Sequence, residues 1–359
     1  MAVKALRPWV RAVDGRDAAS VLRLHEELWF DHDARGGMPA SQDVHVWQTY
    51  GESLARQLLH RDGRRAPHAA FEGKLGHLVA EWEGRVVGQV EVYLDRFGWD
   101  PRTPHVAELR SLIVTEPARG LGLGASLVRE AAAASRTRTG ANTLVAAEVL
   151  ARNEALSFYD RLGFRTLERL IAVVAQPPLV SGFSTDRARA EDASVLAVLD
   201  HEARARRERW GDPRFDPVPS GVGADLVRMI ADGLVLDEAQ REAEPGRTRE
   251  ELLVRDDRGV VRAAGYLVAA PLGPPFAPVM RAEIARIAVD PDDPQAERAA
   301  RALVAHAYRR AATLGATELI VRAPFLDPVG AALGQSLPSR PFSWILAAPA
   351  ALVLQRANR

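Results

Sequence analysis

The sequence predicts an α/β (α+β) protein made of two tandem domains, each with a mixed, mostly antiparallel sheet flanked by helices. Three observations lead to this fold class. The 359 residues exceed the length of one average domain. Several segments of the first half recur in the second half. Within each copy, short strand patterns, a hairpin and helical patterns follow one another in the same order.

The repeat is clearest in three segments that recur 174 or 175 positions further along the chain. These segments begin at Ala19 and Ala193, at Ala107 and Ala282, and at Gly76 and Glu251. Because this period far exceeds that of solenoid repeats, we expect each copy to be a whole domain. The expected domains are residues 1–176 and 184–359, joined by the Pro/Gly/Ser-rich segment 175–184.

Capping and hydrophobic spacing predict the first elements of the first copy. A short strand covers residues 9–13, and Asp17 is a good N-cap for the helix that follows. Residues 44–59 have helical spacing. Residues 77–94 alternate as a hairpin, with Glu83-Gly84 as its turn.

The remaining elements of the first copy alternate between strand and helix. Alternating or apolar strand patterns cover residues 105–114, 143–150 and 166–175. A run of alanines supports a helix over 121–136, because alanine has the highest helix propensity. A second helix covers 153–164 and is stopped by Gly163.

Composition excludes several classes of protein. Lys and Arg together number 47, as do Asp and Glu, so the net charge gives no reason to expect a nucleic acid or membrane partner. The absence of cysteine excludes a disulfide scaffold, a Cys-ligated zinc site and a cysteine nucleophile. The N-terminal segment lacks the apolar core of a signal peptide, and no apolar run is long enough to span a bilayer. We therefore expect a soluble, cytoplasmic protein.

The segment "PARGLGLGASLV", residues 117–128, places alternating glycines at the start of a helix. A P-loop is excluded because no lysine follows Gly124, and a dinucleotide fingerprint is excluded because Leu127 stands where the third glycine belongs. Free N–H groups and the dipole at a helix N-terminus attract anions, glycines leave room for a phosphate, and Arg119 adds positive charge. A glycine-rich turn packed under a neighbouring strand is the alternative.

Together, "LIVTEPARGLGLGASLV" and the downstream "ARNEALSFYDRLGF" resemble the acyl-CoA-binding core of the GNAT superfamily of N-acyltransferases. The resemblance covers roughly residues 106–170, and the duplicated layout is similar to that of tandem members such as mycothiol synthase. It implies acetyl-CoA as the acyl-donor cosubstrate, with no metal.

The resemblance also implies roles for individual residues. In the family, the strand before the glycine turn pairs with the pantetheine arm, and here its residues are Leu112, Ile113 and Val114. The turn amides bind the pyrophosphate, and they belong here to Arg119, Gly120, Leu121, Gly122, Leu123, Gly124 and Ala125. Asn153 matches a position that contacts the cofactor arm. Tyr159 matches the tyrosine at the thioester sulfur, where its hydroxyl can protonate or hydrogen-bond the leaving thiolate; packing in the core is the alternative.

Glu108 is the candidate general base for the acceptor amine, because it shares a strand face with Arg110 just before the glycine turn. A surface ion pair with Arg110 is the alternative. Other acids could serve instead, in the segment that forms the acceptor side in relatives or on the hairpin; these candidates are Glu27, Asp31, Asp33 and Glu91. The spacing of Asp31, His32 and Asp33 is a weak metal signal and indicates a solvated loop or an acceptor contact. The loops 28–76 and 96–105 are expected to select the acceptor.

The second copy departs from the motif at two places. When Leu303 is aligned with Leu127, Arg298 replaces Gly122, and its side chain occupies the path of the phosphate. Further on, Asp327 stands for Asn153, with no tyrosine near Leu333. The C-terminal domain is therefore expected to be degenerate and non-catalytic, with a role in structural support, in completing the acceptor cleft or in dimerisation.

These observations together predict an N-acetyltransferase whose N-terminal domain moves an acetyl group from acetyl-CoA to a primary amine of a small molecule. Direct transfer within a ternary complex is expected, because no cysteine is available to carry the acyl group. Two alternatives stay open. One is a mycothiol-synthase-like acetylation of an amino-sugar thiol precursor, and the other is a non-catalytic acyl-CoA sensor or binding module. A homodimer is compatible with either.

Overall fold

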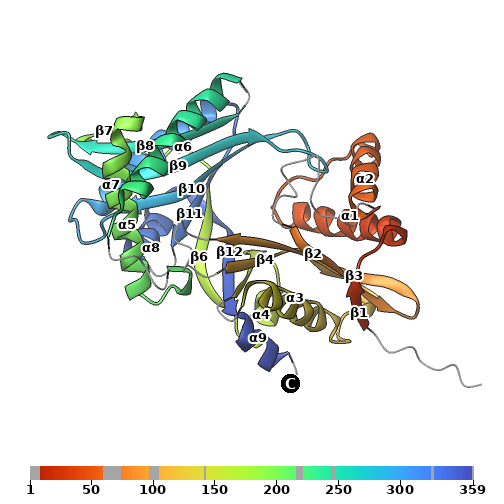
Figure 1. Ribbon diagram of the computed structural model, residues 1–359. Coiled ribbons are helices and arrows are strands. Elements are labelled where there is room, and N and C mark those ends of the chain that lie inside the picture. Colours follow the sequence, from red (N-terminus) through yellow and green to blue (C-terminus); the bar gives the residue numbers. More distant parts are fainter. Residues whose placement is uncertain are drawn as a thin grey trace, which may run out of the picture.

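A single large sheet organises the molecule. The computed structural model describes residues 9–59, 74–96, 105–140, 143–215, 221–243, 247–324 and 327–357. These residues form one 12-stranded sheet, in the order β1-β2-β3-β4-β5-β12-β6-β11-β10-β9-β8-β7. Figure 1 shows α1 and α2 on one side of the N-terminal strands, with α3, α4 and α9 on the other. The predicted mixed, mostly antiparallel α/β architecture is confirmed.

The N-terminal half contains the predicted elements in the predicted order. Its strands are β1 (Trp9–Ala12), β2 (Lys74–Trp82), β3 (Arg85–Arg96), β4 (His105–Val114), β5 (Leu144–Leu150) and β6 (Arg165–Val173). Its α-helices are α1 (Ala18–Ala34), α2 (Val44–Leu59), α3 (Leu123–Thr139) and α4 (Leu156–Arg161), with 3-10 turns η1 (Gly15–Asp17) and η3 (Glu116–Ala118). Only α4 is clearly shorter than the sequence predicts.

The C-terminal half repeats this order. Its strands are β7 (Phe183–Arg187), β8 (Thr248–Asp256), β9 (Val261–Pro271), β10 (Met280–Val289), β11 (Leu319–Pro324) and β12 (Ser339–Pro349). Its α-helices are α5 (Ala193–Arg209), α6 (Ala224–Ala243), α7 (Ala296–Thr313), α8 (Pro328–Ser336) and α9 (Ala350–Arg356), with 3-10 turns η4 (Ala190–Asp192) and η5 (Pro213–Phe215). Among the described helices, none is long and apolar enough to cross a membrane.

Two local predictions are confirmed by backbone geometry. Glu83 and Gly84 both have positive φ, 53° and 74°, as a two-residue turn between antiparallel strands requires. Gly163 has φ 90° and ends α4, and the amide of Phe164 returns to the carbonyl of Tyr159. A residue with a Cβ is strained in this left-handed region, so glycine follows from the backbone path.

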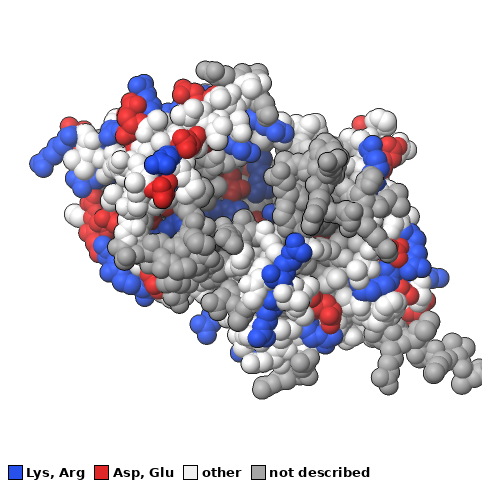
Figure 2. All heavy atoms as spheres, viewed as in Figure 1, with Lys and Arg blue, Asp and Glu red and all other residues white. Residues whose placement is uncertain are grey.

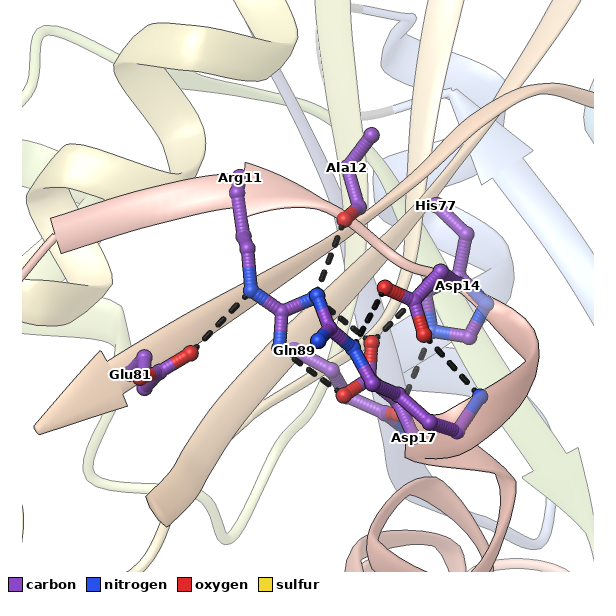
Figure 3. Close-up of polar contacts among 8 residues, drawn as sticks. Arg11, Ala12, Asp14, Asp17, His77, Glu81 and Gln89 are labelled. Carbon is purple, nitrogen blue, oxygen red and sulfur yellow. Dashed lines mark hydrogen bonds and ion pairs between the residues drawn. The ribbon is translucent and has the colours of Figure 1, made fainter. Parts of the chain in front are cut away.

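The predicted capping role of Asp17 is wrong. Asp17 does precede α1, but its carboxylate makes no side-chain cap for that helix. It accepts two hydrogen bonds from Arg11 of β1, at 2.6 and 2.8 Å, and one from the amide of Asp14 (Figure 3). Arg11 also reaches Glu81 of β2 at 3.1 Å. A bidentate arginine is a stronger partner than a helix amide, so Asp17 ties the start of α1 to the sheet.

The two halves exchange their last strands. The N-terminal β6 pairs with β11 and β12, both from the C-terminal half. In return, β12 lies between β5 and β6 and pairs with β5 from Ser343↔Leu150 to Pro349↔Leu144. The sequence did not reveal this exchange, because a strand pattern does not specify its neighbours.

Each hydrophobic core therefore contains residues of the other half. The core under α3 includes Leu346 of β12 and Val353 of α9, both at most 4% exposed. The core under α7 includes Ile171 and Val173 of β6. Because each half's core depends on the other half, the halves are coupled through buried apolar area as well as through the sheet.

Candidate active site

The site begins where β4 and β5 diverge. These strands pair in parallel only from Val106↔Leu144 to Leu109↔Ala147. Against β3, β4 carries one extra residue between Arg110 and Ile113, and Ser111 in this bulge has φ 51°. A bulge bends its strand and increases the local twist, which separates β4 from β5.

Beyond the bulge, the predicted pantetheine-binding residues have one open edge. Ile113 and Val114 pair with Gln89 and Gly88 of β3. Within the described residues, positions 112–114 have no strand partner on the β5 side. Unpaired N–H and C=O groups at such an edge can bind an extended, amide-containing ligand as an added strand would.

The glycine turn lies at the end of this open edge. Gly120 and Gly122 have φ of 83° and 76°, and a Cβ added to either would point into open space. Gly124 has another role, because its Cβ position lies 3.5 Å from the Phe158 ring of α4. Positive φ therefore requires glycine at the first two positions, and the space above them is free for a ligand.

The same turn has the electrostatics of an anion site. The first α3 hydrogen bond runs from the amide of Ser126 to Gly122 O. Among the described residues, no acceptor is found for the backbone N–H groups of residues 120–125. Arg119 is exposed beside them, and its Nε donates to the carbonyl of Val114 at 3.1 Å. Unpaired amides at the N-terminus of a 17-residue helix attract a phosphate.

The structure places Tyr159 in the N-terminal core. It is 5% exposed, and its ring meets those of Phe158 and Phe164 edge to face, each with centroids 5.1 Å away. Burial raises the pKa of its hydroxyl above the usual value, so this group is neutral at physiological pH. No partner for the hydroxyl is found in the described part of the chain. The position suits a neutral hydrogen-bond donor.

Asn153 shapes the turn before α4. Its Oδ1 accepts a hydrogen bond from the amide of Ala155 at 2.9 Å. In the second copy, Asp327 accepts in the same way from Val329 at 2.8 Å. This local bond explains why both copies have an Asn or Asp here, whereas the predicted contact with the cofactor arm stays a prediction.

Glu108 pairs with Arg110 at 2.7 Å. The guanidinium of Arg110 also lies over the Tyr93 ring, 4.4 Å from its centroid. The alternative interpretation of Glu108 as one member of an ion pair therefore describes its geometry, and its catalytic role stays a prediction. Burial and the nearby Glu91 carboxylate raise the pKa of Tyr93.

A buried polar cluster lies behind the bulge, on the face covered by α1 and α2. Glu91 is 6% exposed and accepts a hydrogen bond from the Ser111 hydroxyl at 3.0 Å. His77 hydrogen-bonds Gln89 at 3.2 Å (Figure 3). Its Nδ1 also lies 3.9 Å from the Glu91 carboxylate. His25 of α1 continues the cluster, because its ring stacks on His77. This cluster holds the strained Ser111 in place.

The sequence analysis missed Glu148. Its neighbours Ala147 and Val149 are buried under α3, whereas Glu148 is exposed on the opposite face of β5. Its Oε1 accepts a hydrogen bond from the Ser343 hydroxyl of β12 at 2.6 Å. A signal was present, because Glu148 is the only charged residue in the strand "LVAAEVL".

Asp31, His32 and Asp33 belong to the last turn of α1 and not to an irregular loop. Asp31 pairs with Arg35 at 2.8 Å, and Asp33 accepts from the amide of Ala40 at 3.3 Å. His32 accepts through Nδ1 from the amide of Met38, and burial lowers its pKa to about 4, so it stays neutral. Among the described residues, no group of three such side chains could hold a metal ion.

The second half closes over this end of α1. Phe276, from the β9–β10 loop, meets the Trp29 ring edge to face at 4.9 Å. Backbone bonds join Ser41 to the carbonyl of Pro275 and Ala277 to the carbonyl of Pro39. Figure 2 shows the surface hollowed near the middle of the view, between the two halves, with acidic and basic side chains inside. Residues 60–73 and 97–104 of the loops expected to select the acceptor lie outside the described residues.

The equivalent positions of the second half are filled. With Leu303 aligned to Leu127, α7 begins at Ala296, one turn before the equivalent of the α3 start. Arg298 replaces Gly122, and its side chain donates to the carbonyl of Ser181 and covers the Phe183 ring. A helical turn and a folded-back arginine therefore replace the open glycine turn.

The second half has a corresponding bulge. β10 has one extra residue between Ile284 and Arg286, as β4 has at Ser111. Arg286 binds Asp200 at 2.9 Å and Glu251 at 2.7 Å. The retained Glu283 pairs with Arg322 and Arg281, so it has a structural role in this half.

The diverging strands and the glycine-opened helix define the class of protein. A mixed sheet that opens between β4 and β5, next to a glycine turn with unpaired amides, is the arrangement expected from the sequence motifs that resemble an acyl-CoA-binding core. The comparisons agree with this class. Residues 24–164, which carry the diverging strands and the glycine turn, match the model of the acetyltransferase (GNAT) family.

Solved structures support the same fold over nearly the whole chain. A GCN5-related N-acetyltransferase from Sphaerobacter thermophilus is 15% identical with a TM-score of 0.53, over 96% of each chain. A tandem GNAT protein from the clavulanic acid biosynthesis pathway is 16% identical with a TM-score of 0.50, over 96% of this chain and 98% of that one.

One structural match comes from a larger enzyme. The GCN5-related glucosamine N-acetyltransferase region of a fungal multi-domain GH3 β-N-acetylglucosaminidase is 15% identical with a TM-score of 0.55. The match covers 96% of this chain and 38% of that one. No curated protein matches the chain. Identities this low define the fold alone.

Proposed function

We propose that this protein is an N-acetyltransferase whose N-terminal half, residues 1–176, transfers an acetyl group from acetyl-CoA to a primary amine of a small molecule. The C-terminal half, residues 184–359, is a degenerate copy that supports the site without catalysing the reaction. The observation that carries this proposal is the contrast between the halves. The glycine turn is open in the first half, whereas a helical turn and the folded-back Arg298 side chain take its place in the second.

The binding role follows from the unpaired backbone. In our proposal, the amides of residues 120–125 and the Arg119 guanidinium bind the diphosphate of CoA, whereas the Arg119 amide, which the sequence also predicted as a ligand, already donates to the carbonyl of Glu116. The free edge of residues 112–114 binds the pantetheine amides, and Asn153 contacts the same arm. Because Gly120 and Gly122 leave open space above the turn, the cradle fits a diphosphate without rearrangement.

The chemical roles are distributed around the bulge. Backbone N–H groups of β4 polarise the thioester carbonyl. Tyr159, kept neutral by burial, donates a hydrogen bond to the leaving sulfur. Glu108 is the predicted base, and its carboxylate is paired with Arg110 at 2.7 Å. A ternary complex is required, since the chain has no cysteine to carry the acetyl group.

A panel of primary amines tests the proposal. The full chain is incubated with acetyl-CoA and, in turn, glucosamine, spermidine and tyramine, and the release of CoA thiol and the mass of the product are followed. We expect amine-dependent thiol release with at least one amine and a product heavier by one acetyl group. Tight binding of acetyl-CoA without amine-dependent release would favour the sensor alternative.

A further inference from the structure

The strand opening exposes a carboxylate next to the last paired residues of β4 and β5. Leu109↔Ala147 is the final pair, and Glu148 is the next residue of β5. Its side chain lies on the α1/α2 face, because its two neighbours on the strand pack under α3. Glu148 is exposed in a strand whose other residues are all buried. A charged group in the middle of a sheet stays exposed only where no helix covers that position.

The C-terminal half orients this carboxylate. Ser343 belongs to β12, is 0% exposed, and donates through Oγ to Glu148 Oε1 at 2.6 Å. Hydrogen bonds from a hydroxyl to an ionised carboxylate are short and strong. Because Ser343 is held between β5 and β6 by strand pairing, the carboxylate has a fixed direction.

Within the residues that the structure describes, Glu148 lacks the arginine partner that Glu108, Glu168 and Glu283 each have. Glu108 has Arg110 at 2.7 Å, and Glu283 has Arg322 at 2.5 Å. Glu168 is buried between Arg214 at 3.0 Å and Arg322 at 3.6 Å. Among the described residues, no basic side chain lies within 4.0 Å of the Glu148 carboxylate, and Arg322 attracts it only from farther away.

We propose that Glu148 binds the ammonium group of the acceptor and accepts its first proton, and that Ser343 is the positioning residue that aims the carboxylate. The inference rests on the proposed acetyltransferase function. An ammonium group has three N–H donors and a positive charge. The Glu148 carboxylate offers acceptor oxygens for those donors and the opposite charge. The acceptor is therefore a cationic primary amine that enters between the halves.

The transfer balances with these residues. One ammonium proton passes to a Glu148 oxygen, and the nitrogen lone pair forms the new C–N bond to the acetyl carbonyl carbon. The C–S bond breaks, with its electron pair remaining on sulfur. A second proton from the same nitrogen neutralises the sulfur, and Glu148 returns its proton to solvent. The products are the N-acetyl amine, CoA thiol and one proton.

Four variants of the full chain, assayed with the amines above, test the assignment. Glu148→Gln is expected to lower kcat/KM for the amine by roughly 100-fold, the size typical of a lost proton acceptor. Ser343→Ala is expected to raise the KM for the amine by about 10-fold, as one lost charged hydrogen bond implies, with kcat nearly unchanged. The KM for acetyl-CoA stays constant in both variants. Glu130→Gln and Ser135→Ala, which lose a half-buried acid and a buried hydroxyl elsewhere, serve as controls.

The outcomes separate the two proposals. If the wild type transfers acetyl to none of the amines, the proposed function fails and the inference fails with it. If the wild type is active and Glu148→Gln keeps its kcat/KM, the function stands and the assignment of Glu148 is overturned. Glu108→Gln is measured in parallel. If kcat/KM for the amine falls in that variant instead, Glu108 is the proton acceptor. If Glu148→Gln loses thermal stability or acetyl-CoA binding, Ser343→Ala tests the assignment instead. A raised KM for the amine with nearly unchanged kcat supports the assignment, and an unchanged KM overturns it.

Discussion

At the scale of single residues, Gly122 and Arg298 occupy equivalent places and have opposite effects. Gly122 adopts a left-handed backbone and leaves the turn open. Arg298 continues a helix, and its guanidinium binds the carbonyl of Ser181. Adding a side chain at Gly122 and removing the side chain of Arg298 are therefore expected to change the anion site in different ways.

We expect Gly122→Arg to weaken acetyl-CoA binding by at least about 100-fold, because at least one charge-assisted phosphate contact worth roughly 1.5–3 kcal/mol is lost and the backbone is strained. Titration calorimetry measures this directly. Arg298→Gly is the matched variant and should leave a single site of unchanged affinity, because one glycine does not unwind the extra turn of α7. Two sites, or binding that survives Gly122→Arg, would show that the second copy is active.

Tyr159→Phe separates catalysis from packing. The ring is retained in the same edge-to-face contacts, so acetyl-CoA affinity and melting temperature should change little. Loss of the hydroxyl should lower kcat by roughly 100-fold or more, within the usual range for a group that assists a leaving atom. Steady-state kinetics check this, with Tyr308→Phe of α7 as control. An unchanged kcat would leave Tyr159 as a core residue only.

At the scale of elements, Arg11 and Asp17 connect β1, η1 and β2. Hydrogen bonds from Arg11 lower the pKa of Asp17 below its usual value of 3.8. A carboxyl group with a lowered folded-state pKa stabilises the protein above its unfolded-state pKa, and this contribution disappears as the pH falls through the folded-state value.

Asp17→Asn should therefore lower the free energy of unfolding by a constant amount between pH 7 and pH 5. The difference from wild type should shrink below about pH 4, where Asp17 becomes protonated first in the unfolded chain and, at lower pH, in the folded protein. Urea unfolding at pH 7, 5 and 3 measures it. A difference of the same size at pH 3 would mean that Asp17 acts through shape and not through charge.

The turn between α4 and β6 is packed against α9. A Cβ on Gly163 would lie 2.8 Å from Leu352 Cδ2, and the backbone there has φ 90°. Gly163→Ala should lower the free energy of unfolding by roughly 1–3 kcal/mol, measured by denaturant titration. Gly315→Ala has a similar φ of 89° with no neighbour within 4 Å, so it reports the strain alone. Equal losses in the two variants would show that the α9 contact contributes nothing.

At the scale of the whole molecule, the exchange of β6 and β12 makes the two copies interdependent. Without β12, β5 loses its antiparallel neighbour, and without β11 and β12, β6 loses both of its partners. The core under α3 would also lose Leu346 and Val353. We therefore expect the N-terminal half to keep its shape only while the C-terminal half is present.

Residues 1–176 expressed alone should be largely unfolded by circular dichroism and should not bind acetyl-CoA. Unpaired strand edges and exposed apolar surface leave such a fragment prone to aggregation. Co-expression with residues 177–359 should restore a complex that co-purifies and binds acetyl-CoA. A folded, binding-competent fragment 1–176 would show that the exchanged strands are dispensable.

Local patterns of the sequence determined much of this molecule. Strand alternation, helical spacing and glycine positions predicted the order of elements, because these depend on backbone geometry within a few residues. The glycine turn and the tyrosine motif likewise placed the candidate donor site, and the loss of Gly122's equivalent indicated the degenerate copy. The cap assigned to Asp17 was wrong, because Arg11 offers a stronger partner.

Only the tertiary structure decided how distant segments meet. Glu148 and Ser343 are 195 positions apart, and their contact depends on β12 entering between β5 and β6. The contact of Phe276 with Trp29 and the ion pairs of Arg286 with Asp200 and Glu251 have the same origin. A strand's pattern specifies which face is buried but not which strand lies beside it. The sequence by itself therefore predicted the candidate donor side of the site, and the pairing of strands brought together the residues of the proposed acceptor side.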